Sequence, residues 1–419
     1  MAAGAAAVRA LFVVTPGHGH FYAVAPLALG LQARGHHVRV ATSRGFCATV
    51  AAAGLRPVPA GMDWLESDPD RTFPQFAGLD PVRRAHALGR VFDYFAPRAI
   101  VPDLRALIAG WGPDVVVLEP GALGGQLAAE LHGLPFAMAH GSIPTPRLLA
   151  TLPGDEAGLL AVREALAGPR SRGGLRRELG LPDAEADPWL FLDMVPPSLH
   201  LLTAAHVRRR AHPLRPVHDD PPPDDAEDWS WLDSPAAQPP VVHVSLGTVF
   251  HRAPDVLRAV VRGLAGVRCT LVVALGDVPA AELGPVPTGT RLVRWAPHRR
   301  LLPRCDLFVT HGGTGALMKS LACGVPMLVL PQGGNQFVSA VRVHSTGAGR
   351  HLQPAEVTPE AVAREARRVL EDPVYRLNAA RLRAEIEAMP PLECGLDLLE
   401  RLARERQPLE AEEAPPLLL

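Results

Sequence analysis

The sequence predicts an α/β fold made of two domains. In both halves of the chain, short apolar segments alternate with amphipathic segments of helical length, which is typical of parallel sheets. Residues 218–240 (HDDPPPDDAEDWSWLDSPAAQPP) are rich in proline and acidic residues, and we interpret them as an interdomain linker. The length of 419 residues also exceeds that of one domain of usual size.

The first half begins with a strand–helix–strand unit. Residues 9–15 and 37–42 are predicted strands, and residues 24–33 between them form an amphipathic helix. The elements that follow are a strand, a helix and a strand over residues 114–118, 125–131 and 135–139.

The second half repeats this alternation. The predicted strands cover residues 241–246, 268–275, 291–294 and 307–309. The predicted helices cover residues 255–264, 314–323, 359–370, 373–388 and 395–404.

Residues 295–336 (WAPHRRLLPRCDLFVTHGGTGALMKSLACGVPMLVLPQGGNQ) carry the most specific pattern. They hold a flat aromatic residue, an apolar strand that ends at His311, a glycine-rich turn, a helix, a second apolar strand and a polar pair. Glycines let the backbone approach a ligand closely, and the free N–H groups of a helix N-terminus bind anions. We expect His311 at the carboxyl end of its strand, where open α/β sheets bind ligands. The segment therefore predicts a site for a nucleotide diphosphate.

The order Trp…His-Gly-Gly…Gly-Val-Pro…Pro-Gln-x-x-x-Gln resembles the donor-binding signature of family-1 glycosyltransferases, especially the bacterial enzymes that glycosylate antibiotics and other natural products. The resemblance implies two Rossmann-like domains facing each other across a cleft, the glycosyltransferase B fold. We place an N-terminal acceptor-binding domain at residues 1–217, a linker at 218–240 and a C-terminal nucleotide-sugar-binding domain at 241–388. Residues 389–407 should form a C-terminal helix that packs back on the first domain, and residues 408–419 a disordered tail.

His20 is the predicted catalytic base. Imidazole accepts a proton near neutral pH, and the resemblance matches His20 to the histidine of the family's Gly-His loop, although Ala23 stands where some members have proline. His18 is the alternative base. A base histidine needs an acceptor on its other nitrogen, and the resemblance gives this role to Glu119, where aspartate is commoner. The alternative for Glu119 is a solvated loop acid.

The resemblance also implies residues that bind the sugar donor. It matches His311 and Thr248 to contacts with the diphosphate, and Trp295 to the aromatic residue that stacks on the nucleobase. Core packing is the alternative for Trp295, and a turn or helix-cap role is the alternative for Thr248. The other implied donor-binding positions are Gly313, Thr314, Gly315, Asn335 and Gln336.

Two positions depart from the family pattern. Lys319, the only lysine, stands where many members have a glutamate that binds both ribose hydroxyls, and lysine cannot accept a hydrogen bond. Asn335 stands where an aspartate usually contacts the sugar. A donor with 2′-deoxyribose needs the missing glutamate less, because it has one hydroxyl fewer, and both changes favour a dTDP-activated deoxysugar over UDP-glucose. The alternative is that either change impairs donor binding. The role of His298, which replaces a glutamine of plant relatives, stays open.

Residues 62–97 interrupt the strand–helix pattern and concentrate aromatic side chains. These are Trp64, Phe73, Phe76, Phe92, Tyr94 and Phe95. They form either a local core under long loops or an apolar wall for a bulky acceptor.

Composition and spacing exclude other classes of protein. A net charge of −1 gives no electrostatic case for nucleic acid, and no stretch reaches the roughly 18 apolar residues of a membrane-spanning helix. Cysteines that are widely spaced and lack a CxxC pair are typical of free thiols in a reducing cytoplasm. Tyr22 replaces the third glycine of a dinucleotide-binding loop. Because no histidine–carboxylate spacing is typical of a metal site, we expect no metal and no cofactor besides the nucleotide-sugar co-substrate.

We therefore predict a cytosolic, metal-independent, inverting glycosyltransferase. It would move a sugar from a nucleotide-sugar, with a dTDP-deoxysugar favoured, to a small hydrophobic natural product. The alternatives are a catalytically impaired homologue that binds a partner and a nucleotide-sugar epimerase of the same architecture.

Overall fold

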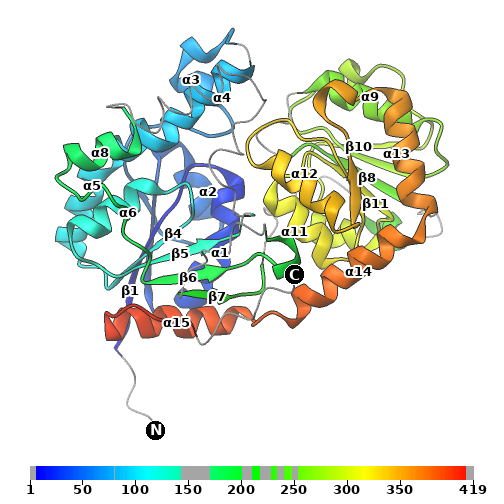
Figure 1. Ribbon diagram of the computed structural model, residues 1–419. Helices are drawn as coiled ribbons and strands as arrows, with labels where there is room; N and C mark the ends of the chain where they lie inside the picture. The colour runs from blue at the N-terminus through cyan, green and yellow to red at the C-terminus, as the bar shows by residue number, and fades with distance from the viewer. Residues whose placement is uncertain are drawn as a thin grey trace.

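The computed structural model describes residues 6–411, except 80, 142, 144–169, 201–209, 218–227, 234–239 and 248–252. Two α/β domains lie side by side (Figure 1). Their sheets have seven and six strands in the described residues, and every strand pairing described there is parallel. The predicted two-domain α/β fold is confirmed.

The N-terminal sheet has the strand order β3-β2-β1-β4-β5-β6-β7. The order reverses between β1 and β4, where open α/β sheets form their ligand sites. In chain order the strands are β1 (Arg9–Val13), β2 (His37–Thr42), β3 (Pro57–Pro59), β4 (Val115–Leu118), β5 (Phe136–His140), β6 (Leu190–Asp193) and β7 (Ala211–Pro213).

Helices cover both faces of this sheet, because its strands are apolar on both sides. The described helices are α1 (His18–Ala33), α2 (Cys47–Ala52), α3 (Pro69–Thr72), α4 (Pro81–Arg90), α5 (Ala96–Trp111), α6 (Leu123–Leu131) and α8 (Arg172–Glu178). The first helix begins at His18, earlier than the sequence pattern predicts, with Gly17 in an extended conformation as its N-cap. His20 therefore lies in the first turn of α1.

The C-terminal sheet has the order β10-β9-β8-β11-β12-β13, and its order reverses between β8 and β11. Its strands are β8 (Val241–Ser245), β9 (Thr270–Ala274), β10 (Arg291–Val293), β11 (Leu307–Thr310), β12 (Met327–Val329) and β13 (Gly349–His351). One face packs on α9 (Pro254–Leu264) and α13 (Pro359–Glu371). The other face packs on α11 (Thr314–Ala322), α12 (Gln336–Ser345) and α14 (Pro373–Ala388), and a short helix, α10 (His298–Leu301), lies near α11.

The last helix, α15 (Leu392–Glu405), packs on the N-terminal domain and not on the domain that precedes it in sequence. In Figure 1 it runs in red along the base of that domain, after α14 has crossed from the other one. Leu396, Leu399 and Leu402 are buried in the same core cluster as α1. Arg34 at the end of α1 also pairs with Asp397 and Glu400.

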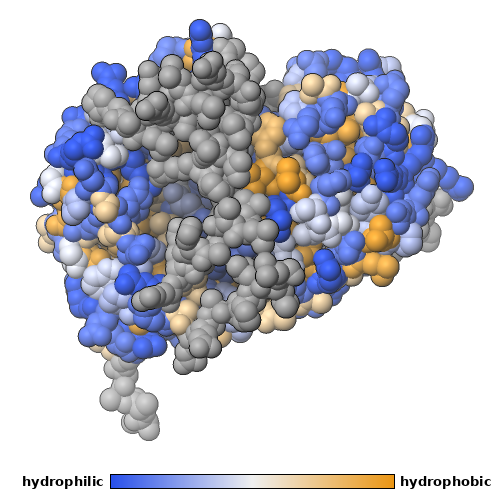
Figure 2. Space-filling view, in the orientation of Figure 1, coloured by the Kyte–Doolittle hydropathy of each residue, from blue (hydrophilic) through white to orange (hydrophobic). Residues whose placement is uncertain are grey.

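The tail differs from its prediction at its start. Leu409 is only 2% exposed, and its backbone N–H donates to the carbonyl of Trp189. The chain is therefore ordered beyond Pro408, because an apolar side chain docks on the first domain; residues 412–419 lie outside the described residues. Among the described helices, none combines the length and apolar composition needed to cross a bilayer. Figure 2 shows mostly hydrophilic side chains on the visible outer faces of both domains.

Candidate active site

The switch point of the N-terminal sheet brings two predicted residues together. Val13 of β1 pairs with Leu118 of β4, so the two strands end side by side. Glu119 follows β4, and His20 lies in the first turn of the helix that follows β1. Nδ1 of His20 is 2.5 Å from Oε2 of Glu119. Because a carboxylate only accepts hydrogen bonds, Nδ1 carries the proton.

Backbone N–H groups hold Glu119 in place. Its Oε1 accepts from Thr15 at 3.0 Å, and its Oε2 accepts from Gly121 at 2.6 Å. The side chain is 1% exposed. Burial raises the pKa of Glu119, but the charge and hydrogen bond of His20 and the hydrogen bonds of Thr15 outweigh it and bring the pKa below its usual range. Glu119 is thus an ionised, immobilised carboxylate.

A second carboxylate lies on the other side of the His20 ring. Oε1 of Glu66 is 3.5 Å from Nε2, the nitrogen that a general base uses. Burial lowers the pKa of His20, but Glu119 and Glu66 outweigh it and raise the pKa well above its usual range. Glu66 was not predicted, because nothing in the local sequence pattern distinguishes it from other loop acids.

His18, the alternative base, has a different environment. Its ring lies against Tyr22 and Phe46, with centroid distances of 6.1 and 5.3 Å. Burial lowers the pKa of His18, and the charge of Glu66 offsets this only in part. Within the described residues, the acid that orients a histidine of this turn is Glu119, and it pairs with His20 and not with His18.

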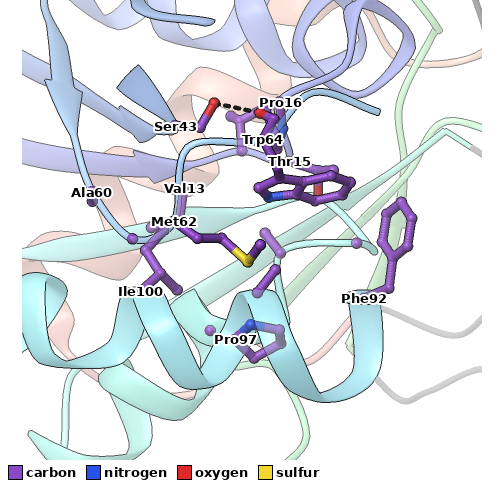
Figure 3. A pocket seen from close by; sticks show the side chains of 16 residues that line it. Val13, Thr15, Pro16, Ser43, Ala60, Met62, Trp64, Phe92, Pro97 and Ile100 are labelled. Carbon is purple, nitrogen blue, oxygen red and sulfur yellow. Dashed lines mark hydrogen bonds between the residues drawn. The ribbon is translucent and has the colours of Figure 1, made fainter. Parts of the chain in front are cut away.

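An apolar pocket, partly open to solvent, lies next to Thr15 and Gly121, the two residues whose N–H groups bind Glu119 (Figure 3). Trp64, Phe92, Met62 and Ile100 line it, and the ring centroids of Trp64 and Phe92 are 5.4 Å apart. Phe92 also approaches His20, at 5.9 Å between centroids. Trp64 and Phe92 therefore belong both to a local core cluster and to the wall of a cavity.

His311 lies at the switch point of the other sheet. It follows β11 where that strand pairs with β8, and it is 7% exposed. A Cβ atom at either Gly247 or Gly313 would overlap the imidazole, so the two glycines leave the space that the ring fills. Burial lowers the pKa of His311 to about 4, in spite of a hydrogen bond with the backbone of Ser245. The ring is therefore neutral at pH 7.

The N-terminus of α11 lies beside His311. Gly313 is the residue before this helix, and Thr314 and Gly315 form its first turn. Nδ2 of Asn335 donates to Oγ1 of Thr314 at 3.1 Å, which ties the loop after β12 to this helix end. The structure thus gathers five predicted positions, including His311 and Asn335, around a helix N-terminus. Thr248 lies outside the described residues.

Comparisons with known proteins identify the family. The family models for the N-terminal and C-terminal domains of erythromycin biosynthesis protein CIII-like proteins match residues 29–211 and 258–400. The 4'-demethylrebeccamycin synthase of Lentzea aerocolonigenes is 33% identical, over 94% of this chain and 99% of that protein. The chain belongs to the EryCIII-like family. The aklavinone 7-beta-L-rhodosaminyltransferase of Streptomyces galilaeus is 30% identical, over 93% of this chain and 95% of that protein. The chain is a glycosyltransferase, and the resemblance inferred from residues 295–336 is confirmed.

Solved structures agree with this assignment. The glycosyltransferase SnogD from Streptomyces nogalater is 27% identical with a TM-score of 0.68, over 95% of this chain and 100% of that one. SsfS6 of Streptomyces sp. SF2575, solved with thymidine diphosphate, is 26% identical with a TM-score of 0.72, over 94% and 99% of the two chains. The EryCIII-like chain therefore has the glycosyltransferase B fold.

Gln336 has a structural task in this EryCIII-like protein. Its Oε1 accepts from the backbone N–H groups of Gln332 and Gly333, at 2.7 and 3.2 Å, and the residue is 4% exposed. The carbonyl end of the amide therefore fixes the loop after β12. A contact between Gln336 and a sugar would have to use its Nε2 group.

A group of basic side chains lies near α10 and α11. Burial, together with His243, Lys319 and His311, lowers the pKa of His298 well below its usual range. Its ring centroid is 5.3 Å from that of His243. Trp295, which precedes α10, is half-buried and so has a partly exposed surface. His298, whose role the sequence leaves open, thus lies within electrostatic reach of His311, a predicted donor-binding residue.

Proposed function

We propose that this glycosyltransferase transfers a sugar with inversion from a dTDP-deoxysugar to a small hydrophobic natural product, without a metal ion. His20 is the general base, and Glu119 orients it. The observation that carries the proposal is the 2.5 Å contact between His20 and Glu119 beside an apolar cavity. A base held by an ionised acid is the arrangement that activates a hydroxyl nucleophile.

The reaction is a single displacement. The acceptor hydroxyl donates its proton to Nε2 of His20 while its oxygen bonds to the anomeric carbon, and the bond from that carbon to the diphosphate breaks on the opposite face. Glu119 stabilises the imidazolium that forms, because its carboxylate faces Nδ1. Since attack and departure are on opposite faces, the anomeric configuration inverts.

The leaving diphosphate is stabilised by the C-terminal domain. The first turn of α11 offers backbone N–H groups and the positive end of a helix dipole. His311 is neutral and has one N–H, so it donates to the diphosphate in place of its hydrogen bond to the backbone of Ser245. Donors fixed in advance where charge develops contribute about 3–4 kcal/mol each in comparable sites. These groups take the role that a divalent cation has in other transferases.

Two observations support a dTDP-linked donor. Lys319 is half-buried on α11, and lysine cannot accept hydrogen bonds from a ribose 2′-hydroxyl. The related SsfS6 was solved with thymidine diphosphate. A ribose 2′-hydroxyl would find no hydrogen-bond acceptor at Lys319. A 2′-deoxyribose has no such hydroxyl and therefore loses nothing there.

A catalytically impaired homologue is the second candidate, because Lys319 and Asn335 depart from the family pattern. The paired His20 and Glu119 favour the active enzyme. The test is a mass-spectrometric screen of the wild type with a panel of dTDP- and UDP-sugars and hydroxylated aromatic acceptors. Transfer that is lost in His20→Ala supports the proposal. Absence of transfer and of donor hydrolysis across the panel supports the impaired homologue.

A further inference from the structure

The loop that carries Glu66 is fixed at several points. Oδ1 of Asp63 accepts from the N–H of Gly45 at 2.6 Å, and the hydroxyl of Ser43 donates to the carbonyl of Trp64 at 2.7 Å, a bond drawn in Figure 3. The N–H of Glu66 itself donates to the carbonyl of Pro16 at 3.0 Å. The position of Glu66 over the first turn of α1 therefore follows from the fold.

The backbone also leaves space for this carboxylate. A Cβ atom at Gly17 would overlap Oε2 of Glu66, so a residue with a side chain at position 17 would displace it. The side chain of Glu66 is 17% exposed, and its carboxylate lies 3.5 Å from Nε2 of His20. A largely enclosed carboxylate thus stands where the acceptor hydroxyl must meet the base.

The proposed reaction breaks the ion pair between Glu66 and His20. His20 must be neutral to accept a proton, and the acceptor hydroxyl must then occupy Nε2. Glu66 loses its cation at that moment, and a poorly solvated carboxylate without a donor is unfavourable. An acceptor that brings a second O–H or N–H group restores a hydrogen bond to it.

We propose that Glu66 determines acceptor specificity by binding a second hydrogen-bond donor on the atom next to the hydroxyl that is glycosylated. The inference rests on the proposed function. The two acceptor atoms, Nε2 of His20 and Oε1 of Glu66, are 3.5 Å apart, a spacing that two donors on adjacent carbons can bridge. The acceptor class is therefore a vicinal diol, a catechol or a hydroxyl beside an N–H group. Sites built to bind such a donor reject analogues that lack it.

The test compares two flat acceptors that differ in one donor. The probes are 7,8-dihydroxyflavone and 7-hydroxy-8-methoxyflavone, with the dTDP-sugar that the enzyme turns over or hydrolyses fastest. We expect the wild type to favour the diol by about 10- to 100-fold in kcat/KM, from the penalty of an unpaired buried acceptor. In Glu66→Leu the ratio should fall close to one. Asp68→Asn, which removes a charge from the same loop, should keep the wild-type ratio.

A second variant separates recognition from folding. Glu66→Gln keeps the shape of the side chain and an acceptor oxygen, so it should retain dTDP binding and give an intermediate ratio. The ascending limb of its pH profile should also move to lower pH, which a merely structural role for Glu66 would not produce. If turnover of the probes is too slow, the ratio is read from their dissociation constants in the presence of dTDP.

A wild type that does not distinguish the probes, that does not bind the diol, or whose ratio survives Glu66→Leu would overturn the inference. Equal transfer to both probes would leave the proposed glycosyl transfer intact. A wild type that neither hydrolyses the donor nor transfers a sugar to any acceptor would instead refute the proposed function.

Discussion

Nδ1 of His20 lies 2.5 Å from Oε2 of Glu119, although 99 positions separate the two residues in the chain. Their proximity follows from the pairing of β1 with β4, which ends two strands at one point of the sheet. The contact fixes which nitrogen carries the proton and leaves Nε2 for chemistry.

Replacing His20 by alanine should lower kcat by roughly 10²–10⁴-fold, the usual contribution of a general base. The affinity for dTDP should be almost unchanged, because the proposed donor site lies in the other domain. Steady-state kinetics and calorimetry measure the two quantities. His18→Ala is the matched control and should retain most activity; a reversal of the two phenotypes would move the base to His18.

The pH dependence of kcat/KM should show an ascending limb above pH 6.5. Only neutral His20 accepts a proton, and Glu119 and Glu66 raise its pKa well above 6.5 against the opposing effect of burial. Activity therefore rises as the pH increases through this raised pKa. His18, in the same turn, also faces Glu66. Glu66→Gln removes one of the two charges, so its limb should shift to lower pH; an unshifted limb would mean that Glu66 does not act on His20.

Lys319→Glu should move nucleotide preference towards UDP. The new carboxylate can accept a hydrogen bond from the 2′-hydroxyl, and one hydrogen bond contributes about 0.5–1.5 kcal/mol, or a few-fold to about tenfold in affinity. Calorimetric titration of dTDP and UDP into both proteins measures the change. The wild type should bind dTDP at least as tightly as UDP, and a clear wild-type preference for UDP would refute the donor assignment.

Turnover should not depend on a divalent cation. The proposed stabilisation of the diphosphate uses His311 and the N–H groups at the start of α11. Initial rates in excess EDTA should match those with added magnesium or manganese. A strict requirement for either ion would show that another group neutralises the leaving diphosphate.

Leu399→Ala should destabilise the protein by about 2–5 kcal/mol, because it opens a cavity where α15 packs on the first domain. Leu399 is fully buried, whereas Leu377 on α14 is 68% exposed and provides the control. Denaturant unfolding followed by circular dichroism compares the two variants. Equal stability of Leu399→Ala and Leu377→Ala would mean that α15 contributes little to the fold.

Most of the strands were predicted from their apolar runs, but the apolar strand β6 (Leu190–Asp193) was not, and two short strands were missed for a physical reason. Leu307–Thr310 is an uninterrupted apolar run that ends at a glycine turn, and the structure has β11 there. Pro57–Pro59 and Ala211–Pro213 are three-residue strands that contain proline, a residue that argues against a strand. Helix α5 was missed for a related reason, since it contains Pro97 and Pro102.

The candidate site follows the same division. Three of the site residues follow an apolar run directly or lie in the turn beyond it, so the sequence predicts their place at a sheet edge; they are His20, Glu119 and His311. Glu66 has no such signal, because its approach to His20 depends on loop contacts made by Ser43 and Pro16. The role of Gln336 as a backbone tether likewise depends on a turn that the sequence does not specify.

The docking of α15 sets a rule for recombining this enzyme with its relatives. The first domain is built from two separate segments of the chain, because α15 completes its core. The N–H of Arg215 also donates to the carbonyl of Pro390, just before that helix. A chimera that exchanges nucleotide-sugar domains at one junction would join α15 of one parent to the sheet of the other. Two junctions are needed, one within residues 218–240 and one near Pro391, so that each hybrid keeps a first domain from a single parent.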